Sequence, residues 1–277
     1  WAGELFAKLD LPIAIMPEIV SPGTIVGKLT REIALELGCE QIPIAAVGSH
    51  DTASAVAAVP ADMSQPWAYL SCGTWSLLGV ELPQAAINDL TFNLQFTNEG
   101  GVNGTVRLLK NIMGLWLLQE CRRFWQGQGV ELSYEQITKM AQEAPAFTAY
   151  IDPADQSFLS PGNMPEKINE FLTRTWQKPI SDKGTMARAI LESLAMNYAL
   201  TLEQLEEITG TKIECLHIVG GGIQNELLCQ FTADSTGRRV IAGPIEATAS
   251  GNILMQAKAV GQVRDLQHIR DIVKNSF

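Results

Sequence analysis

The second half of the chain alternates between short apolar runs and longer amphipathic stretches. The runs at 213–219 and 239–242 have the length of buried strands, and the stretches at 186–208, 224–235 and 246–260 carry apolar residues at helical spacing. Strands that alternate with helices are typical of α/β proteins. We therefore predict that the strands of this half are joined by helices.

The middle of the chain is richer in strand-like runs. Apolar residues at 67–72 and 75–80 flank Gly73 and Thr74, an arrangement that predicts a β-hairpin with a tight turn. Three further elements are predicted after the hairpin: strands at 92–97 and 104–108, and a long helix at 111–125. With the alternating elements that follow, the prediction is an α/β fold with a mixed sheet flanked by helices.

The first 60 residues place a carboxylate in an unusual setting. Helices are expected at 1–9 and 30–37, and the apolar run 42–47 predicts a buried strand. The sequence GSHDTAS follows, so Asp51 stands between this strand and a helix of small residues. Open α/β sheets place ligand sites at such strand ends. The alternative is that Asp51 only caps the helix by accepting N–H bonds from its first turn.

The composition is that of a globular protein and disfavours several partners. The 277 residues are 46% hydrophobic and 18% charged, with a formal net charge of -10. Without a cluster of Lys and Arg, nucleic acid is not expected as a partner. No apolar run approaches the ~20 residues of a membrane span, so no membrane association is expected either. The five cysteines are scattered and odd in number, which favours reduced thiols in a cytoplasmic protein over a zinc site or disulfides.

Two glycine-containing turns have the character of phosphate or nucleotide sites. Gly73 and Thr74 place backbone N–H groups at a hairpin tip, a concavity suited to a phosphate, although a tight turn alone also calls for glycine. The glycines 220–222 lie between a strand and a helix, whose N-terminus favours a phosphate or a polar heterocycle. Asn225 stands where the dinucleotide fingerprint requires a glycine, and no Walker A loop is present. A nucleotide other than NAD is predicted, and with the acid at Asp51 this pattern fits a phosphotransferase.

The ordered motifs from about residue 20 to residue 260 resemble those of the FGGY carbohydrate kinases. The motifs are GSHDTASA, SCGTWSLLG, NEGG, LLKNIMGLWLLQE, SFLSPGNMP, HIVGGGIQNELLCQFTAD and GPIEATASGNILMQA. The resemblance implies an actin-like ATPase (ribonuclease H-like) fold of two lobes, with ATP and a sugar in the cleft between them. The family's opening strand with its Asp-x-Gly phosphate loop is absent. We therefore expect residues 1–60 to be the tail of the N-terminal, sugar-binding lobe and residues 61–277 to be the C-terminal, nucleotide-binding lobe.

The resemblance also implies roles for individual residues. Asp51 matches the catalytic base that takes the proton of the sugar hydroxyl, and His50 and Thr52 flank it where the sugar would lie. The other matches are expected at the nucleotide: Gly73 and Thr74 at the phosphates, Asn111 and Gln119 on one face of the long helix, Gly220, Gly221 and Gly222 behind the adenine, and Asn225 at the start of the helix beside it. ATP and Mg2+ are the implied cofactors, and no residue is assigned as a metal ligand.

Structural roles are the alternative for three of these residues. Asn111 could be a helix N-cap, Gln119 a solvated helix residue, and His50 a core histidine that is bonded to a backbone group.

Within the family, the motifs are most similar to those of kinases that phosphorylate L-rhamnulose at its 1-hydroxyl. Because most of the sugar-binding lobe is missing, L-fuculose, D-xylulose and glycerol are alternative substrates. A non-catalytic actin-like module that binds a nucleotide is an alternative of another class, and a buried Asp51 would favour the enzyme because such a module needs no base. The fragment alone is expected to be inactive, and its uncovered cleft surface to favour a homodimer.

Overall fold

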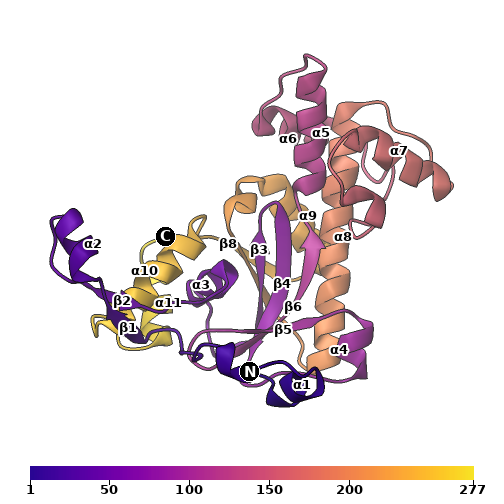
Figure 1. Ribbon diagram of the computed structural model, residues 1–277. Helices are drawn as coiled ribbons and strands as arrows, with labels where there is room; N and C mark the ends of the chain where they lie inside the picture. Colours follow the sequence, from indigo (N-terminus) through magenta and orange to yellow (C-terminus); the bar gives the residue numbers. More distant parts are fainter.

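The computed structural model describes residues 1–277 and is built around a six-stranded mixed sheet. The strands lie in the order β5-β6-β4-β3-β7-β8 (Figure 1). Their bounds are β3 Trp67–Cys72, β4 Trp75–Leu82, β5 Thr97–Gly100, β6 Val106–Met113, β7 Cys215–Val219 and β8 Arg239–Ala242. The β3, β7 and β8 strands run parallel, whereas β3, β4, β6 and β5 form antiparallel neighbours. The predicted mixed sheet is therefore confirmed.

Helices cover both faces of the sheet. On one face a large apolar core forms between the sheet and the helices α5 (Trp116–Gly127), α8 (Lys183–Thr209) and α9 (Glu226–Thr236). On the other face a smaller core includes α3 (Asp51–Ala57), α10 (Ala247–Ala259) and α11 (Leu266–Lys274). Alternate residues of a strand point to opposite faces, so Leu70 enters the first core and Tyr69 the second.

The α8 helix is the longest element and extends beyond the sheet. The Asp182 carboxylate caps its start by accepting a hydrogen bond from the Thr185 N–H at 2.7 Å, and Gly210 ends it in the left-handed conformation with φ +64°. At the far end of α8, the helices α5, α6 and α7 form a projecting helical group (Figure 1). The remaining bounds in this part are α4 Asp89–Asn93, α6 Tyr134–Glu143, α7 Met164–Arg174 and the single 3-10 turns η2 Gln156–Phe158 and η3 Gly221–Gln224.

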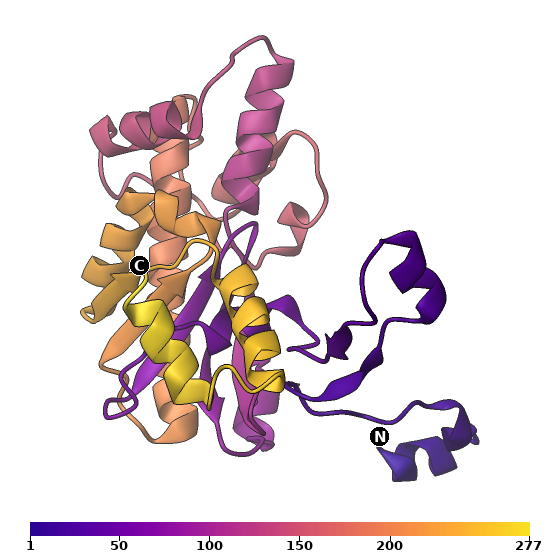
Figure 2. The same cartoon turned by 90° about the vertical axis from the view of Figure 1, so that its left-hand side faces the viewer.

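The first 47 residues form an arm that stands away from the rest of the molecule (Figure 2). Its elements are α1 Gly3–Lys8, η1 Ile13–Ile15, β1 Ile25–Lys28, α2 Arg31–Glu36 and β2 Pro43–Ala45. The strand predicted at 42–47 is present as β2, but its predicted burial is wrong, because β2 pairs only with β1 in a separate two-stranded sheet and Ile42 is 53% exposed. Ala34 is the only buried residue of this arm.

Two further predictions in the middle of the chain are wrong. Residues 92–97 are not a strand, since α4 occupies the first part of this range and β5 begins only at Thr97. The start of the helix expected at 111–125 is also wrong: the helix is present as α5, but β6 continues to Met113 and α5 begins at Trp116. The β3–β4 hairpin, α8, β7, α9, β8 and α10 are confirmed to within a few residues.

The structure also bears on the expectations about membrane spans and cysteines. None of the helices combines the length and the hydrophobicity that a membrane-spanning segment requires. All five cysteines are free thiols, and three of them, Cys72, Cys121 and Cys215, are buried.

His217 is a core histidine of β7, as its place in an apolar strand suggests. Its side chain is buried, and its ring meets the Trp67 ring edge to face at a centroid distance of 6.0 Å. Burial lowers the pKa of His217 to about 4, and the nearby Arg239 and Arg270 guanidinium groups act in the same direction. The imidazole is therefore neutral in the folded protein at neutral pH.

We predict that His217 makes the protein less stable in mild acid. Its pKa is about 4 when folded and 6.5 in its unperturbed form, so the unfolded chain binds the extra proton as the pH falls from 6.5 to 4. The free energy of unfolding should decrease over this window by roughly 2 to 3 kcal/mol from this residue. Urea unfolding of the parent and of His217→Gln across the window measures this, and the variant should show the shallower dependence. Parallel curves would contradict the prediction.

Candidate active site

A cavity of about 700 Å3 lies where the parallel strands β3 and β7 end. Seven of the residues predicted to form the site line it together: His50, Asp51, Thr52, Gly73, Asn111, Gly220 and Gly221. Four other lining residues were not predicted: Ser71, Cys72, Trp75 and Leu77. Thr74, Gln119, Gly222 and Asn225 lie outside the lining.

The helix cap of α3 is His50 and not Asp51. The His50 Nδ1 atom accepts a hydrogen bond from the Thr52 N–H at 3.2 Å, which satisfies a donor of the first helical turn. Asp51 is the first residue inside the helix, and its side chain is 74% exposed. Asp51 is therefore not the buried carboxylate that would favour an enzyme. The alternative of a core histidine at His50 is wrong as to burial, because the side chain is 53% exposed, although it is bonded to a backbone N–H.

The Asp51 carboxylate keeps most of its hydrogen-bonding capacity free. Its only side-chain donor is the Thr52 hydroxyl, at 3.4 Å from Oδ1. His50 Nδ1 lies 3.2 Å from the same oxygen, but both side chains are largely exposed, and contacts between exposed groups of this kind are weak. Asp51 therefore faces the cavity as an acceptor without a strong partner.

Close packing between α3 and α10 fixes the position of Asp51. Every residue of α3 from Thr52 to Ala57 is buried, and the small side chains allow the two helices to approach closely. A Cβ atom at Gly251 of α10 would collide with the Ser54 carbonyl of α3. The run of small residues after Asp51 thus serves this helix contact.

The tip of the β3–β4 hairpin is held by the start of α5. The Gly73 carbonyl accepts from the Leu115 N–H at 3.0 Å, and the Thr74 carbonyl accepts from the N–H groups of Gly114 and Trp116, both at 3.1 Å. The Thr74 hydroxyl donates to Gln119 Oε1 at 3.0 Å, which leaves the Gln119 amide nitrogen without a partner. Thr74 and Gln119 therefore form a polar pair beside the cavity.

Asn111 lies in β6 and not on a helix with Gln119, which corrects its expected placement. The strand register sets Val219, Ser71, Leu77 and Asn111 in one row across the sheet. Ser71 and Asn111 both line the cavity, so the Asn111 amide lies in the same cavity as Asp51. Ser71 could have been found from the alternation of strand β3, because it stands two residues from Tyr69 and two before Gly73.

The glycines that follow β7 have different roles. A Cβ atom at Gly220 would meet the Cys72 carbonyl, and one at Gly222 would meet the Cys72 side chain, whereas Gly221 has open space. Gly220 also has a φ of +89°, which favours glycine. Asn225 caps α9, since its Oδ1 atom accepts the Leu228 N–H at 2.9 Å.

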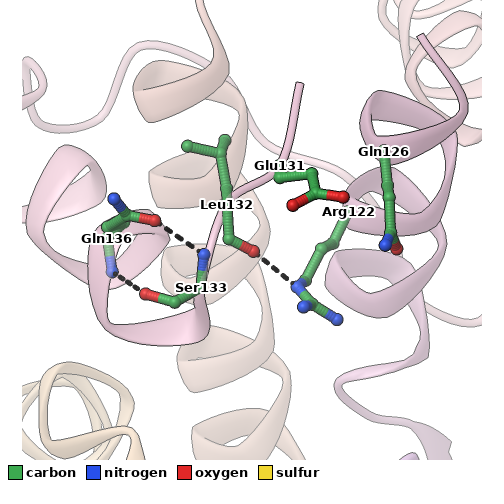
Figure 3. Close-up of a pocket in the computed structure, with 6 residues that line it drawn as sticks. All are labelled: Arg122, Gln126, Glu131, Leu132, Ser133 and Gln136. Carbon is green, nitrogen blue, oxygen red and sulfur yellow. Dashed lines mark hydrogen bonds between the residues drawn. The ribbon is translucent and has the colours of Figure 1, made fainter. Parts of the chain in front are cut away.

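A smaller cavity of about 290 Å3 lies between α5 and α6 (Figure 3). Its polar groups are largely used to hold the turn between these helices. Arg122 Nε donates to the Leu132 carbonyl at 2.7 Å, and Ser133 and Gln136 form a reciprocal capping box. None of the residues predicted for the site lies there.

The larger cavity suits phosphoryl transfer between two bound molecules. It holds a free carboxylate, an amide, a hydroxyl and two glycine turns whose backbones a ligand can approach. Asp51 is its only carboxylate, and no three His, Cys, Asp or Glu side chains of the chain come together as a metal site. These residues fit a Mg2+ ion that arrives on nucleotide phosphates, because Mg2+ prefers phosphate and water oxygens with few protein ligands.

Comparisons of sequence place this geometry in a family. Residues 68–260 match the C-terminal domain of the FGGY family of carbohydrate kinases. The chain is 44% identical over 274 residues to the rhamnulokinase of Bacteroides thetaiotaomicron, covering 99% of the chain and 56% of that protein. It is 42% identical over 279 residues to the rhamnulokinase of Bacillus subtilis, covering 99% of the chain and 57% of that protein. The chain thus spans about half the length of the curated relatives it matches.

Comparisons of structure agree on the fold. A ligand-bound xylulose kinase from Lactobacillus acidophilus superposes with a TM-score of 0.73 at 18% identity, covering 98% of the chain and 54% of that protein. A gluconate kinase from the same organism gives a TM-score of 0.70 at 18% identity, covering 98% of the chain and 54% of that protein. The predicted actin-like ATPase fold is therefore confirmed.

We predict that Gly251→Ala lowers the stability of the protein by disturbing the contact between α3 and α10, on which the position of Asp51 depends. The added methyl group is directed at the Ser54 carbonyl, and such overpacking costs about 1–3 kcal/mol of stability. Gly127→Ala is the matched control, because a Cβ atom at this position of α5 meets no other atom. Urea unfolding of the two variants checks the prediction, and equal midpoints would contradict it.

Proposed function

The chain belongs to the FGGY family of carbohydrate kinases, and from this premise we propose that the whole protein phosphorylates L-rhamnulose at its 1-hydroxyl with ATP. The choice of L-rhamnulose rests on the rhamnulokinases that are 38–44% identical to the chain. The choice of reaction rests on one observation: the free Asp51 carboxylate shares a cavity with two glycine turns that a nucleotide can approach.

In this proposal Asp51 is the general base. Its exposed carboxylate accepts the proton of the 1-hydroxyl as the oxygen attacks the γ-phosphorus of ATP, and the bond to the leaving oxygen of ADP breaks. His50 holds the first turn of α3 through the Thr52 N–H, so Asp51 need not serve as a cap. His50 and Thr52 then border the sugar, beside the base.

The nucleotide occupies the two glycine turns in the proposal. The hairpin tip at Gly73 and Thr74, with Gln119, binds the phosphates, and the turn from Gly220 to Gly222 lies against the adenine. Asn225 acts indirectly, by starting α9 behind that turn. Asn111 shares the Asp51 cavity, which supports a place at the junction of the sugar and the transferred phosphoryl group.

A bound Mg2+ ion would neutralise charge on the ATP phosphates during transfer. It would be held mainly by phosphate oxygens and water, and no residue of the chain is assigned to it.

The chain supplies the nucleotide-binding lobe in this proposal, with residues 1–60 as the tail of the sugar-binding lobe and 61–277 as the second lobe. The separate β1–β2 sheet and the exposed apolar side chains of the arm support this division. The α3 helix connects the two parts, since it falls in the first range and packs against α10 in the second. Closure of the lobes would shield Asp51 from water, which otherwise competes with the sugar as acceptor.

We predict that the full-length protein loses activity in Asp51→Asn while retaining ATP binding. Removal of a general base should lower kcat about 100-fold or more. The carboxylate is free of protein contacts other than Thr52 and His50, so ATP affinity and folding should change little. ATP consumption with L-rhamnulose, and by comparison with L-fuculose, D-xylulose and glycerol, measures both the activity and the substrate.

His50→Gln is a useful companion variant, because it alters the cap of α3 and leaves the carboxylate in place. It should lose less activity than Asp51→Asn. Normal turnover by Asp51→Asn would exclude the mechanism and favour a module that only binds the nucleotide.

A further inference from the structure

A buried tyrosine lies directly behind the tip of the β3–β4 hairpin. Tyr198, in α8, is fully buried, and its hydroxyl lies 2.7 Å from the Ser76 Oγ atom. Ser76 is also fully buried, and it pairs with Cys72 in the last ladder position before the tip. The Cys72 thiol is the other polar group beside the Tyr198 hydroxyl. The bond between Tyr198 and Ser76 ties α8, on the core side of the sheet, to the hairpin.

Cys72 extends this contact to the second glycine turn. Its Sγ atom lies 3.9 Å from Ser76 Oγ, and its side chain and carbonyl lie against Gly222 and Gly220. Burial raises the pKa of the Cys72 thiol to about 11, so the group stays uncharged and packs as a small apolar side chain. Tyr198, Ser76 and Cys72 therefore form a buried node that contacts both turns.

The hairpin tip is held from a second side as well, by the start of α5. On its other side, the backbone N–H groups at 114–116 bind the two tip carbonyls. A Cβ atom at Gly114 would collide with Ser76 Oγ, so the start of α5 also rests on the node. Without the Tyr198 hydroxyl, the buried Ser76 hydroxyl would keep only its weak bond to the Cys72 thiol, a state that a shift of the strand end would relieve.

We infer that Tyr198 is a positioning residue for the nucleotide, because its bond to Ser76 sets the spacing between the hairpin at Gly73 and the glycine turn at 220–222. The inference rests on the proposed function in one respect, that both turns bind one ATP molecule. It assigns a role to a side chain that touches neither ATP nor sugar. The affinity for ATP, and not that for the sugar, should depend on the node.

Tyr69 provides a matched control for Tyr198. It is also fully buried, and its hydroxyl has no hydrogen bond to the protein. It lies in the same strand as Cys72 but points to the opposite face of the sheet, into the smaller core. Tyr69→Phe therefore removes a buried tyrosine hydroxyl from β3 without touching the node.

The test uses the full-length protein, with ATP affinity measured by titration calorimetry and the KM for L-rhamnulose measured by turnover. Tyr198→Phe should weaken ATP binding about ten-fold, and Tyr69→Phe should leave it within about two-fold of the parent. The KM for L-rhamnulose should not change in either variant. The double variant Tyr198→Phe/Ser76→Ala removes both polar partners and should recover part of the lost ATP affinity, because no buried hydroxyl is left unpaired.

Several results would overturn the inference. Unchanged ATP affinity in Tyr198→Phe would do so, as would an equal loss in Tyr69→Phe, which would indicate a general effect on the core. The proposed function fails separately: if ATP affinity follows the node but L-rhamnulose never drives turnover, the substrate is wrong and the positioning role stands. The complete absence of ATP binding by the parent would remove both.

Discussion

The end of strand β3 is approached by backbone from two other parts of the chain, and each approach depends on glycine. Gly220 and Gly222 lie against Cys72, and Gly114 lies against Ser76 and the carbonyl of Gly73. A Cβ atom at any of these three positions would collide with its neighbour, so the turns could not come this close. The tip of the β3–β4 hairpin, the start of α5 and the turn after β7 can therefore meet beside the cavity. Gly114, Gly220 and Gly222 are thus required by close packing, whereas Gly73 and Gly221 have room for a ligand beside them.

The position of Asp51 in the cavity also depends on a close contact at a glycine. The α3 helix approaches α10 closely through Gly251, and this contact determines where the first turn of α3 lies. His50 satisfies the N–H of that turn, so the neighbouring carboxylate points into the cavity without a structural task. The cavity therefore combines the free Asp51 carboxylate with the glycine turns at Gly73 and Gly220. The arm before α3 leaves many of its apolar side chains exposed.

The sequence predicted the elements whose patterns are unambiguous and failed where two patterns overlap. Residues 108–125 are apolar enough to continue one helix, and only Gly114 and Leu115 separate the end of β6 from α5, so Asn111 was placed on the wrong element. Residues 92–97 alternate like a strand, but the capping box between Asn88 and Thr91 starts a helix before them. The exposure of Asp51 and of β2 could not be predicted, because apolar runs and small residues do not reveal which surface covers them. The Tyr198–Ser76 bond joins residues 122 positions apart, which no local pattern reports.

We propose that Asp51 and the hairpin tip face a single transferred phosphoryl group. The most direct test is a crystal structure of the full-length protein with L-rhamnulose and a non-hydrolysable ATP analogue. We expect the 1-hydroxyl within about 2.6–3.2 Å of an Asp51 carboxylate oxygen. The γ-phosphate should lie on the other side of this hydroxyl, against Gly73 and Thr74. A sugar hydroxyl that lies beyond hydrogen-bonding distance of Asp51, or phosphates bound away from the hairpin in the closed complex, would contradict it.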